Sequence, residues 1–285
     1  MNPPDCAHRC SGLSRRFPYA LFALISLCST TAVAAEWSDA FIGYRYGTLY
    51  REPANANDIS KNILTVQYAN GYSYGSNFFN LDILLSDSKD PAAGGGGGAA
   101  EAYFVYRHNL SLSAVTGRSL QYAALRDVGI TAGFDLNTKN DAFGSRKQKF
   151  AVGPTLQFEV PGFLNISLLY QIENNRNGIV GKDVHFDDTY DLNLSWGIPF
   201  KLGLPAKFKG FADYIGPKGQ DGFGNTTHPE LLIEMAQMFD LGSLAGKSDI
   251  FFAGVGFQYW HNKFGNAPGV GTQAAVPQLE FEVHF

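Results

Sequence analysis

Residues 150–160 read FAVGPTLQFEV, and this stretch decides the fold class. From Phe150 onward every second residue is apolar or proline, whereas the residues between them are small or polar. Such period-two alternation is the pattern of a β-strand whose two faces meet different surroundings. The stretch 279–285, LEFEVHF, alternates in the same way. The sequence therefore predicts an all-β protein.

Segments of this kind recur along the chain from residue 37 onward. Twelve strands are predicted, at 37–49, 61–69, 76–87, 101–112, 124–136, 148–160, 163–173, 186–198, 206–216, 228–240, 249–261 and 274–285. Most of them are about twice as long as a usual globular strand. Segments 61–69 and 228–240 alternate less regularly than the others.

The connections between these segments alternate in length. Brief turns are predicted at 70–75, 161–162, 199–205 and 241–248, with a somewhat longer connection at 113–123. Longer stretches rich in Asn, Asp, Gly and Pro lie at 50–60, 88–100, 137–147, 174–185, 217–227 and 262–273. In an up-and-down barrel this order places every long loop at one end, as in outer-membrane barrels. We therefore predict a transmembrane up-and-down antiparallel β-barrel of about 12 strands.

Alternation alone does not say which face points inward. A soluble barrel or sandwich would place the apolar face inside. The strand lengths suit a tilted crossing of the bilayer, and a closed barrel leaves no unpaired backbone edge in lipid. The last strand, which ends on Phe285, resembles the assembly signal of bacterial outer-membrane proteins. We expect an apolar outer wall, a bacterial outer-membrane location, and contacts with lipid, lipopolysaccharide and the barrel assembly machinery.

The N-terminus has the layout of a secretory signal peptide. Arg9, Arg15 and Arg16 precede an apolar run at 17–28 and small residues at 29–35. This order predicts a cleaved signal peptide at 1–34 and a barrel at 35–285. A membrane anchor is the alternative, but the apolar run is short for a spanning helix. Cleavage would remove all three cysteines, so no disulfide or cysteine-bound metal is expected.

Charge also bounds the function. The chain has 22 Lys and Arg against 26 Asp and Glu, a formal net charge of −4. This balance gives no basic footprint, so nucleic acid is not an expected partner.

By parity, the lumen would carry aromatic and charged side chains of both signs. The candidates for solute binding are Phe41, Arg45, Asp82, Glu101, Arg107, Phe252, Trp260, Glu280 and Glu282. An aromatic ring can stack on a planar solute while a carboxylate or arginine bonds the polar edge of that solute. Phe41 and Trp260 are expected to share one wall at different depths. The alternative is that the charges form a structural ion-pair ladder and the rings fill a constriction.

A family resemblance appears in several short stretches. These are 41–47 (FIGYRYG) followed by Glu52-Pro53, 77–82 (NFFNLD) with Ser86-Asp87, 101–103 (EAY) with 110–113 (LSLS), and 259–261 (YWH). In them the chain resembles the Tsx-like nucleoside-specific outer-membrane channel family. The resemblance implies a monomeric twelve-stranded barrel that passes nucleosides. It assigns no binding residue to a position here, and the glycine run at 94–98 suggests a different mouth.

The sequence therefore favours a passive channel for small planar solutes, nucleosides first, with no cofactor, no metal and no enzymatic activity. The alternatives are a general or other-solute diffusion porin and a barrel whose loops act as a receptor, for example for phage or colicin. An outer-membrane phospholipase would need a serine and a histidine on the lipid-facing wall. His108 has outward parity, but no nearby outward serine with a basic partner stands out. The acidic stretch 183–188 is read as a solvated loop or, alternatively, a site for a divalent cation.

Overall fold

The computed structural model describes residues 35–93, 97–141 and 144–285, so the predicted signal peptide lies outside the described residues. The strands are β1 (Trp37–Tyr50), β2 (Ile59–Tyr72), β3 (Gly75–Ser86), β4 (Ala100–Ser111), β5 (Leu125–Lys139), β6 (Gln148–Phe158), β7 (Phe163–Asn177), β8 (Lys182–His185), β9 (Thr189–Leu202), β10 (Leu204–Ile215), β11 (Glu230–Asp240), β12 (Phe251–His261) and β13 (Ala274–His284). Short helical elements are α2 (Leu112–Thr116), η2 (Pro91–Ala93), η3 (Gly242–Ala245) and η4 (Lys263–Gly265). In this part of the chain, no helix has the length and apolar character needed to cross a bilayer.

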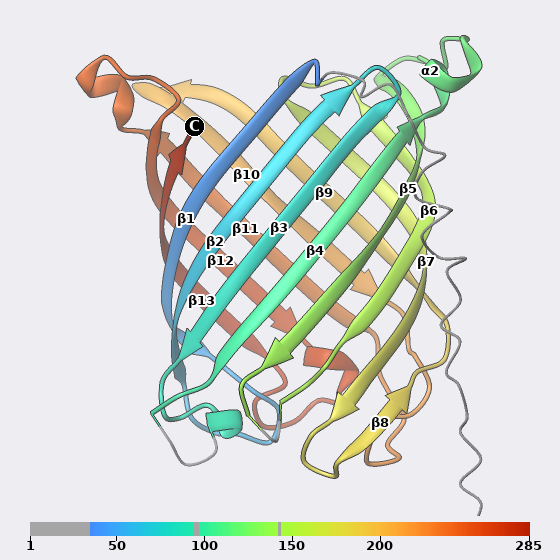
Figure 1. Ribbon diagram of the computed structural model, residues 1–285, viewed down its shortest axis with the longest axis vertical. Helices are drawn as coiled ribbons and strands as arrows, with labels where there is room; N and C mark the ends of the chain where they lie inside the picture. The colour runs from blue at the N-terminus through green and yellow to red at the C-terminus, as the bar shows by residue number, and fades with distance from the viewer. Residues whose placement is uncertain (1–34, 94–96, 142–143) are drawn as a thin grey trace, which may run out of the picture. The chain divides into compact units, whose positions relative to one another are not determined.

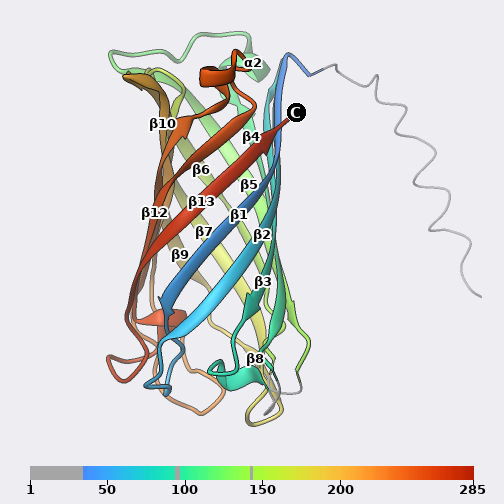
Figure 2. The ribbon, with the colours of Figure 1, turned by 90° about the vertical axis from the view of Figure 1, so that its left-hand side faces the viewer.

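Twelve of the strands form a closed antiparallel ring (Figures 1 and 2). Each strand pairs with its neighbour in sequence, β6 pairs with β7, and β1 pairs with β13 to complete the ring. The short strand β8 pairs with β7 and extends it as a hairpin outside the ring. The predicted up-and-down barrel of about twelve strands is confirmed.

The long and short connections separate as predicted. The long loops, together with β8 and η2, lie at the lower end of the barrel in Figure 1, whereas α2 and the short turns lie at the upper end. The predicted turn at 199–205 is too wide, because β9 and β10 leave only Gly203 between them. Gly203 has a φ of 71°, in the left-handed region that glycine adopts at low cost.

Strand β13 shows which face of the ring is polar. Leu279, Phe281 and Val283 are 41–53% exposed on the outside of the barrel. Glu280 and Glu282 alternate with them and are 3–4% exposed on the inside. The apolar side chains therefore form the outer wall and the polar side chains line the interior, the reverse of a soluble barrel.

Strand β8 is the main element that the sequence pattern did not predict. It lies in the stretch predicted as a long loop at 174–185, where Asn174 pairs with His185 and Asn177 with Lys182. Both faces of this hairpin are mostly polar, so the residues show no period-two alternation of apolar and polar side chains. A hairpin that projects beyond the bilayer needs no apolar face, which explains why the pattern is missing.

Candidate functional site: the barrel lumen

A cavity of about 2160 Å³ occupies the interior of the barrel. All twelve strands of the ring contribute lining residues. Residues of the long loops, such as Ala54 and Ile179, and of the short turns, such as Ser73 and Gly162, also line it. The cavity therefore extends from one end of the barrel to the other, and it exceeds the roughly 300–1,000 Å³ of an ordinary ligand pocket.

An arginine extends along one side of the lumen at mid-depth. Arg45 on β1 holds Asp82 on β3 through Nη2, 2.6 Å from Asp82 Oδ2, and its Nη1 is ion-paired with Glu234 on β11. Thr65 donates to the other oxygen of Asp82 at 2.7 Å, and Gln258 donates to Glu234 at 2.8 Å. We call the three residues Asp82, Arg45 and Glu234 the Arg45 strut. It fixes charged groups of both signs on the lumen surface.

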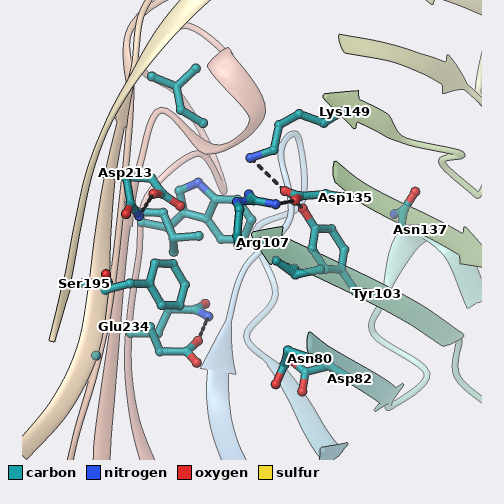
Figure 3. A pocket seen from close by; sticks show the side chains of 18 of the residues that line it. Asn80, Asp82, Tyr103, Arg107, Asp135, Asn137, Lys149, Ser195, Asp213 and Glu234 are labelled. Carbon is teal, nitrogen blue, oxygen red and sulfur yellow. Dashed lines mark hydrogen bonds and ion pairs between the residues drawn. The ribbon is translucent and has the colours of Figure 1, made fainter. Parts of the chain in front are cut away.

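A second charged group lies on another part of the wall. Asp135 on β5 accepts from Arg107 Nη1 at 2.5 Å and from Lys149 Nζ at 2.7 Å. The Tyr103 hydroxyl also donates to Asp135, at 3.2 Å. Figure 3 shows Asp213 on the far side of the lumen from this group. Asp213 accepts from the Asn193 amide at 2.6 Å. The middle of the lumen is thus bordered by charged and aromatic groups on both sides.

The long-loop end of the lumen holds Trp260 in a network of charges. Its indole Nε1 donates to Glu230 Oε1 at 2.7 Å, and Lys263 Nζ lies 4.4 Å from the centre of an indole ring. Lys263 and Lys61 both contact Glu52 Oε1, at 3.2 and 2.9 Å. Glu52 and Lys263 belong to different loops, so this network joins the two loops on either side of the β1–β13 seam.

Burial and neighbouring charges have opposite effects on the pKa values of Glu52 and Lys263. Burial alone would raise the pKa of Glu52, but Lys263 and Lys61 outweigh it and hold that pKa well below its ordinary value. Burial lowers the pKa of Lys263 to about 8, and Glu52 offsets only part of that effect. Near neutral pH both groups therefore remain charged, and Lys263 begins to lose its proton in mildly alkaline solution.

The predicted rings near the short-turn end are largely covered. Phe41 is 4% exposed; the centre of its ring lies 4.9 Å from that of His284 and 5.0 Å from Lys209 Nζ. Phe252 is also 4% exposed and packs in an apolar cluster with Ala236 and Met238. Both rings face inward as parity requires, but their faces are occupied by protein groups.

The structure places all nine predicted site residues on the inner face of the ring, and it joins Arg45 directly to Asp82. Arg107 pairs with Asp135, Glu101 with Lys139 at 3.3 Å, and Glu282 with Lys209. The expected shared wall of Phe41 and Trp260 is present, since β1, β13 and β12 are neighbours. Phe41 pairs with His284 and Trp260 with Ala274, ten positions apart on β13. That separation is about 33 Å along the strand, too far for one small solute to touch both rings.

Two lumen rings that the residue types alone did not single out are better placed. Tyr103 pairs across the sheet with Asp82, and Phe211 pairs with Glu234. Both rings line the cavity and are partly exposed to it. Directly opposed residues of neighbouring strands have Cβ atoms about 4.5–5.5 Å apart. The two rings therefore flank the Arg45 strut, a relationship that inward parity permits but does not specify.

Two further candidates from the sequence have ordinary partners. His108 faces outward, and its hydrogen bonds within the described chain go to Asn77 Oδ1 at 3.0 Å and the Tyr72 hydroxyl at 3.5 Å. In the acidic stretch, Asp183 lies 4.0 Å from Arg146 and His185 lies 2.6 Å from Asn174. Across residues 35–93, 97–141 and 144–285, no group of three or more acidic, histidine or cysteine side chains is arranged to hold a metal ion.

No protein-family model matches the chain, and no curated protein matches it. Among solved structures, the COG4313 outer membrane channel from Pseudomonas putida F1 is similar, with a TM-score of 0.51 and 13% identity over 89% of this chain and 96% of that one. The KdgM porin in complex with disordered oligogalacturonate has a TM-score of 0.44 and 10% identity over 86% and 99%. The NanC porin has a TM-score of 0.43 and 9% identity over 87% and 99%.

These identities establish likeness of fold. The closed ring of twelve strands and its apolar outer wall already require a bilayer around the barrel. The fold that the chain shares with the Pseudomonas channel is that of a bacterial outer-membrane protein. The chain is a β-barrel of the bacterial outer membrane.

Proposed function

We propose that the chain is a passive channel that lets small polar solutes cross the outer membrane. The observation that supports this most strongly is the single cavity lined by all twelve strands and by residues of both barrel ends. The lumen lies within one chain, so a monomer suffices to form the path. Both signs of charge border it, which favours small, largely uncharged solutes over strongly acidic or strongly basic polymers.

Within this class we propose nucleosides as the first solutes to test. The proposal rests on the two rings beside the Arg45 strut, since Tyr103 adjoins Asp82 and Phe211 adjoins Glu234. A base could stack on either ring while the ribose hydroxyls bond a neighbouring carboxylate or the Arg45 guanidinium. The resemblance to the nucleoside-specific channels points to the same solute.

The expected affinity is weak, as passage requires. Stacking on an aromatic ring contributes about 1–3 kcal/mol per base in nucleic-acid proteins. After the cost of confining the solute, such a contact corresponds to binding near the millimolar range. A solute held much more tightly would leave too slowly to be transported.

Block of ion current by nucleosides tests the nucleoside proposal. Adenosine or uridine, added to single channels in planar bilayers, should reduce the current in a saturable way. Replacing both Tyr103→Leu and Phe211→Leu should weaken the block about tenfold or more, the loss expected for about 1.4 kcal/mol of stacking. The matched controls are Phe104→Leu and Phe208→Leu on the same strands, which have outward parity. If nucleosides at tens of millimolar do not reduce the wild-type current, the nucleoside proposal is wrong and a porin with another solute preference is the better interpretation.

A receptor role for the long loops is a second candidate, because apolar side chains are exposed at their tips. Ile179 is 67% exposed, Val270 60% and Phe223 54%, all beyond the strands of the ring. Exposed apolar residues in loops are common at protein–protein contacts. Replacing the three residues with serine should abolish the sensitivity of host cells to a phage or colicin that uses this barrel, while the barrel still assembles in the outer membrane.

A further inference from the structure

Glu280 is a lumen carboxylate without a protein partner. It faces inward from β13, lines the cavity and is 3% exposed. Within residues 35–93, 97–141 and 144–285, the Glu280 carboxylate makes no hydrogen bond and no ion pair. A buried carboxylate normally has a donor or a cation beside it, so Glu280 stands out in this lumen.

The cations near Glu280 are bound to other acids. Arg45 is its direct cross-strand neighbour, but the Arg45 guanidinium is directed to Asp82 and Glu234. Lys209 is ion-paired with Glu282, two residues further along β13. Neither cation is bonded to Glu280, which is left without an ion-pair partner in this part of the wall.

A glycine on the adjacent strand sets the position of this carboxylate. A Cβ atom on Gly256 of β12 would collide with Glu280 Oε1 and would lie 3.2 Å from Gln278 Oε1. Because Gly256 has no side chain, the Glu280 carboxylate lies back against the wall of the lumen. Gln278, beside the same glycine, is bonded through its amide to the Tyr50 hydroxyl at 2.9 Å.

The Glu280 carboxylate thus borders the lumen with no bonded donor among the described residues. We propose that Glu280 is a binding station for solutes that carry a cationic N–H donor group, above all a planar amidinium or guanidinium. Such a group offers two parallel N–H donors, which fit a carboxylate, and its positive charge favours the ionised form of the buried Glu280 carboxyl. The two oxygens of one carboxylate are too few for a hard metal ion such as Ca²⁺, which takes 6–8 oxygen ligands.

This inference rests on the proposed channel, because the solute reaches Glu280 only through the lumen. It goes beyond that proposal because it predicts how strongly solutes of the same shape but different charge block the channel. Benzamidinium, benzamide and benzoate share a planar ring and differ mainly in whether the substituent is cationic, neutral or anionic. The station predicts strong block by benzamidinium, weak block by benzamide and none by benzoate.

The test is block of single-channel current by these three probes in wild type and in Glu280→Gln. The variant should lose at least tenfold in apparent affinity for benzamidinium, with block measured as a fraction of the variant's own open current. The matched control is Glu101→Gln, which removes a carboxylate that is paired with Lys139 elsewhere in the lumen. Gly256→Ala, which displaces the Glu280 carboxylate, should also weaken the block and serves if Glu280→Gln assembles poorly.

Equal block of wild type and Glu280→Gln by benzamidinium would overturn the station, because the probe would then be held by the general charge of the lumen. Equal block by benzamide and benzamidinium would overturn it as well. Failure of the channel proposal would give a different result, because the inserted barrel would then carry no current even before a probe is added. Block by benzamidinium without block by nucleosides would support the station and contradict only the nucleoside assignment.

Discussion

Arg45 and Glu234 form an ion pair although their strands, β1 and β11, are separated in the ring by β13 and β12. The same guanidinium holds Asp82 on β3, two strands away in the other direction. Arg45 thus spans an arc of the wall that includes six strands. Contacts between neighbouring strands are common to all barrels, but this one ties distant parts of the lumen wall together.

Removal of this arginine should widen the lumen and change its selectivity. In Arg45→Ala, the single-channel conductance should rise, and cations should be favoured more strongly because Asp82 and Glu234 lose their counter-charge. Conductance and reversal potential in a salt gradient measure both effects. Arg51→Ala is the control, because Arg51 pairs with Asp58 in an exposed loop. An unchanged reversal potential in Arg45→Ala would contradict the role of the strut.

The inside-out arrangement predicts opposite effects of arginine on the two faces. Leu168 is 53% exposed on the outer wall, whereas Ser195 lines the lumen. Leu168→Arg should destabilise the barrel by about 2–4 kcal/mol if it lies near the bilayer midplane. Ser195→Arg should be tolerated because the lumen is wet. Urea unfolding in lipid vesicles compares the two, and equal losses of stability would show that the faces are assigned wrongly.

Loop stability should depend on alkaline pH through Lys263. The pKa of a lysine in an unfolded chain is about 10.4, whereas burial holds the pKa of Lys263 at about 8 in the fold. Between these values the unfolded chain binds more protons, so this residue makes the folded state more stable as pH rises, by up to about 3 kcal/mol. The change in the free energy of unfolding between pH 7 and pH 9.5 should be smaller in Lys263→Met than in the wild type. An identical pH response in both proteins would exclude this role of Lys263.

A row of hydroxyl groups on the inner wall should contribute to stability. Thr155 is 1% exposed and lies 2.6 Å from Thr131 Oγ1 and 2.8 Å from Ser167 Oγ. Thr155→Val keeps the shape of the side chain but leaves both neighbours without this partner, which should cost about 1–3 kcal/mol. The control is Thr138→Val on the exposed face of β5. A loss no larger than that of the control would mean that water replaces the missing contacts.

The sequence predicts the face of each residue well, because side chains alternate strictly along a strand. On β13 the pattern of Glu280 and Glu282 inside, with Leu279 and Phe281 outside, agrees with the structure position by position. A shift of one residue would expose every polar side chain to lipid, so the register is strongly constrained. The same argument does not apply to β8, whose hairpin lies beyond the bilayer.

Contacts across the lumen could not be predicted in this way. Parity places Phe41, Trp260 and Tyr103 inside, but it does not tell that Lys209 covers the first ring and Lys263 the second. Lys263 follows Trp260 by three residues, and the path of the loop after β12 brings it over the indole. Lys209 comes from a strand distant in sequence from Phe41, so the curvature of the ring decides that they meet. The Arg45–Glu234 pair has the same origin. Parity also does not predict how exposed an outer residue is. Trp196 has outward parity but is only 8% exposed, because it packs beside Phe208.

The central claim is that solutes pass through the lumen of a single chain. The purified barrel, inserted into a planar lipid bilayer in potassium chloride, should give discrete current steps of uniform size. Arg45→Ala should give larger steps, because the strut borders the path. Liposomes that contain the barrel should swell in an isotonic nucleoside solution. A folded, inserted barrel that carries no current and causes no swelling would contradict the account.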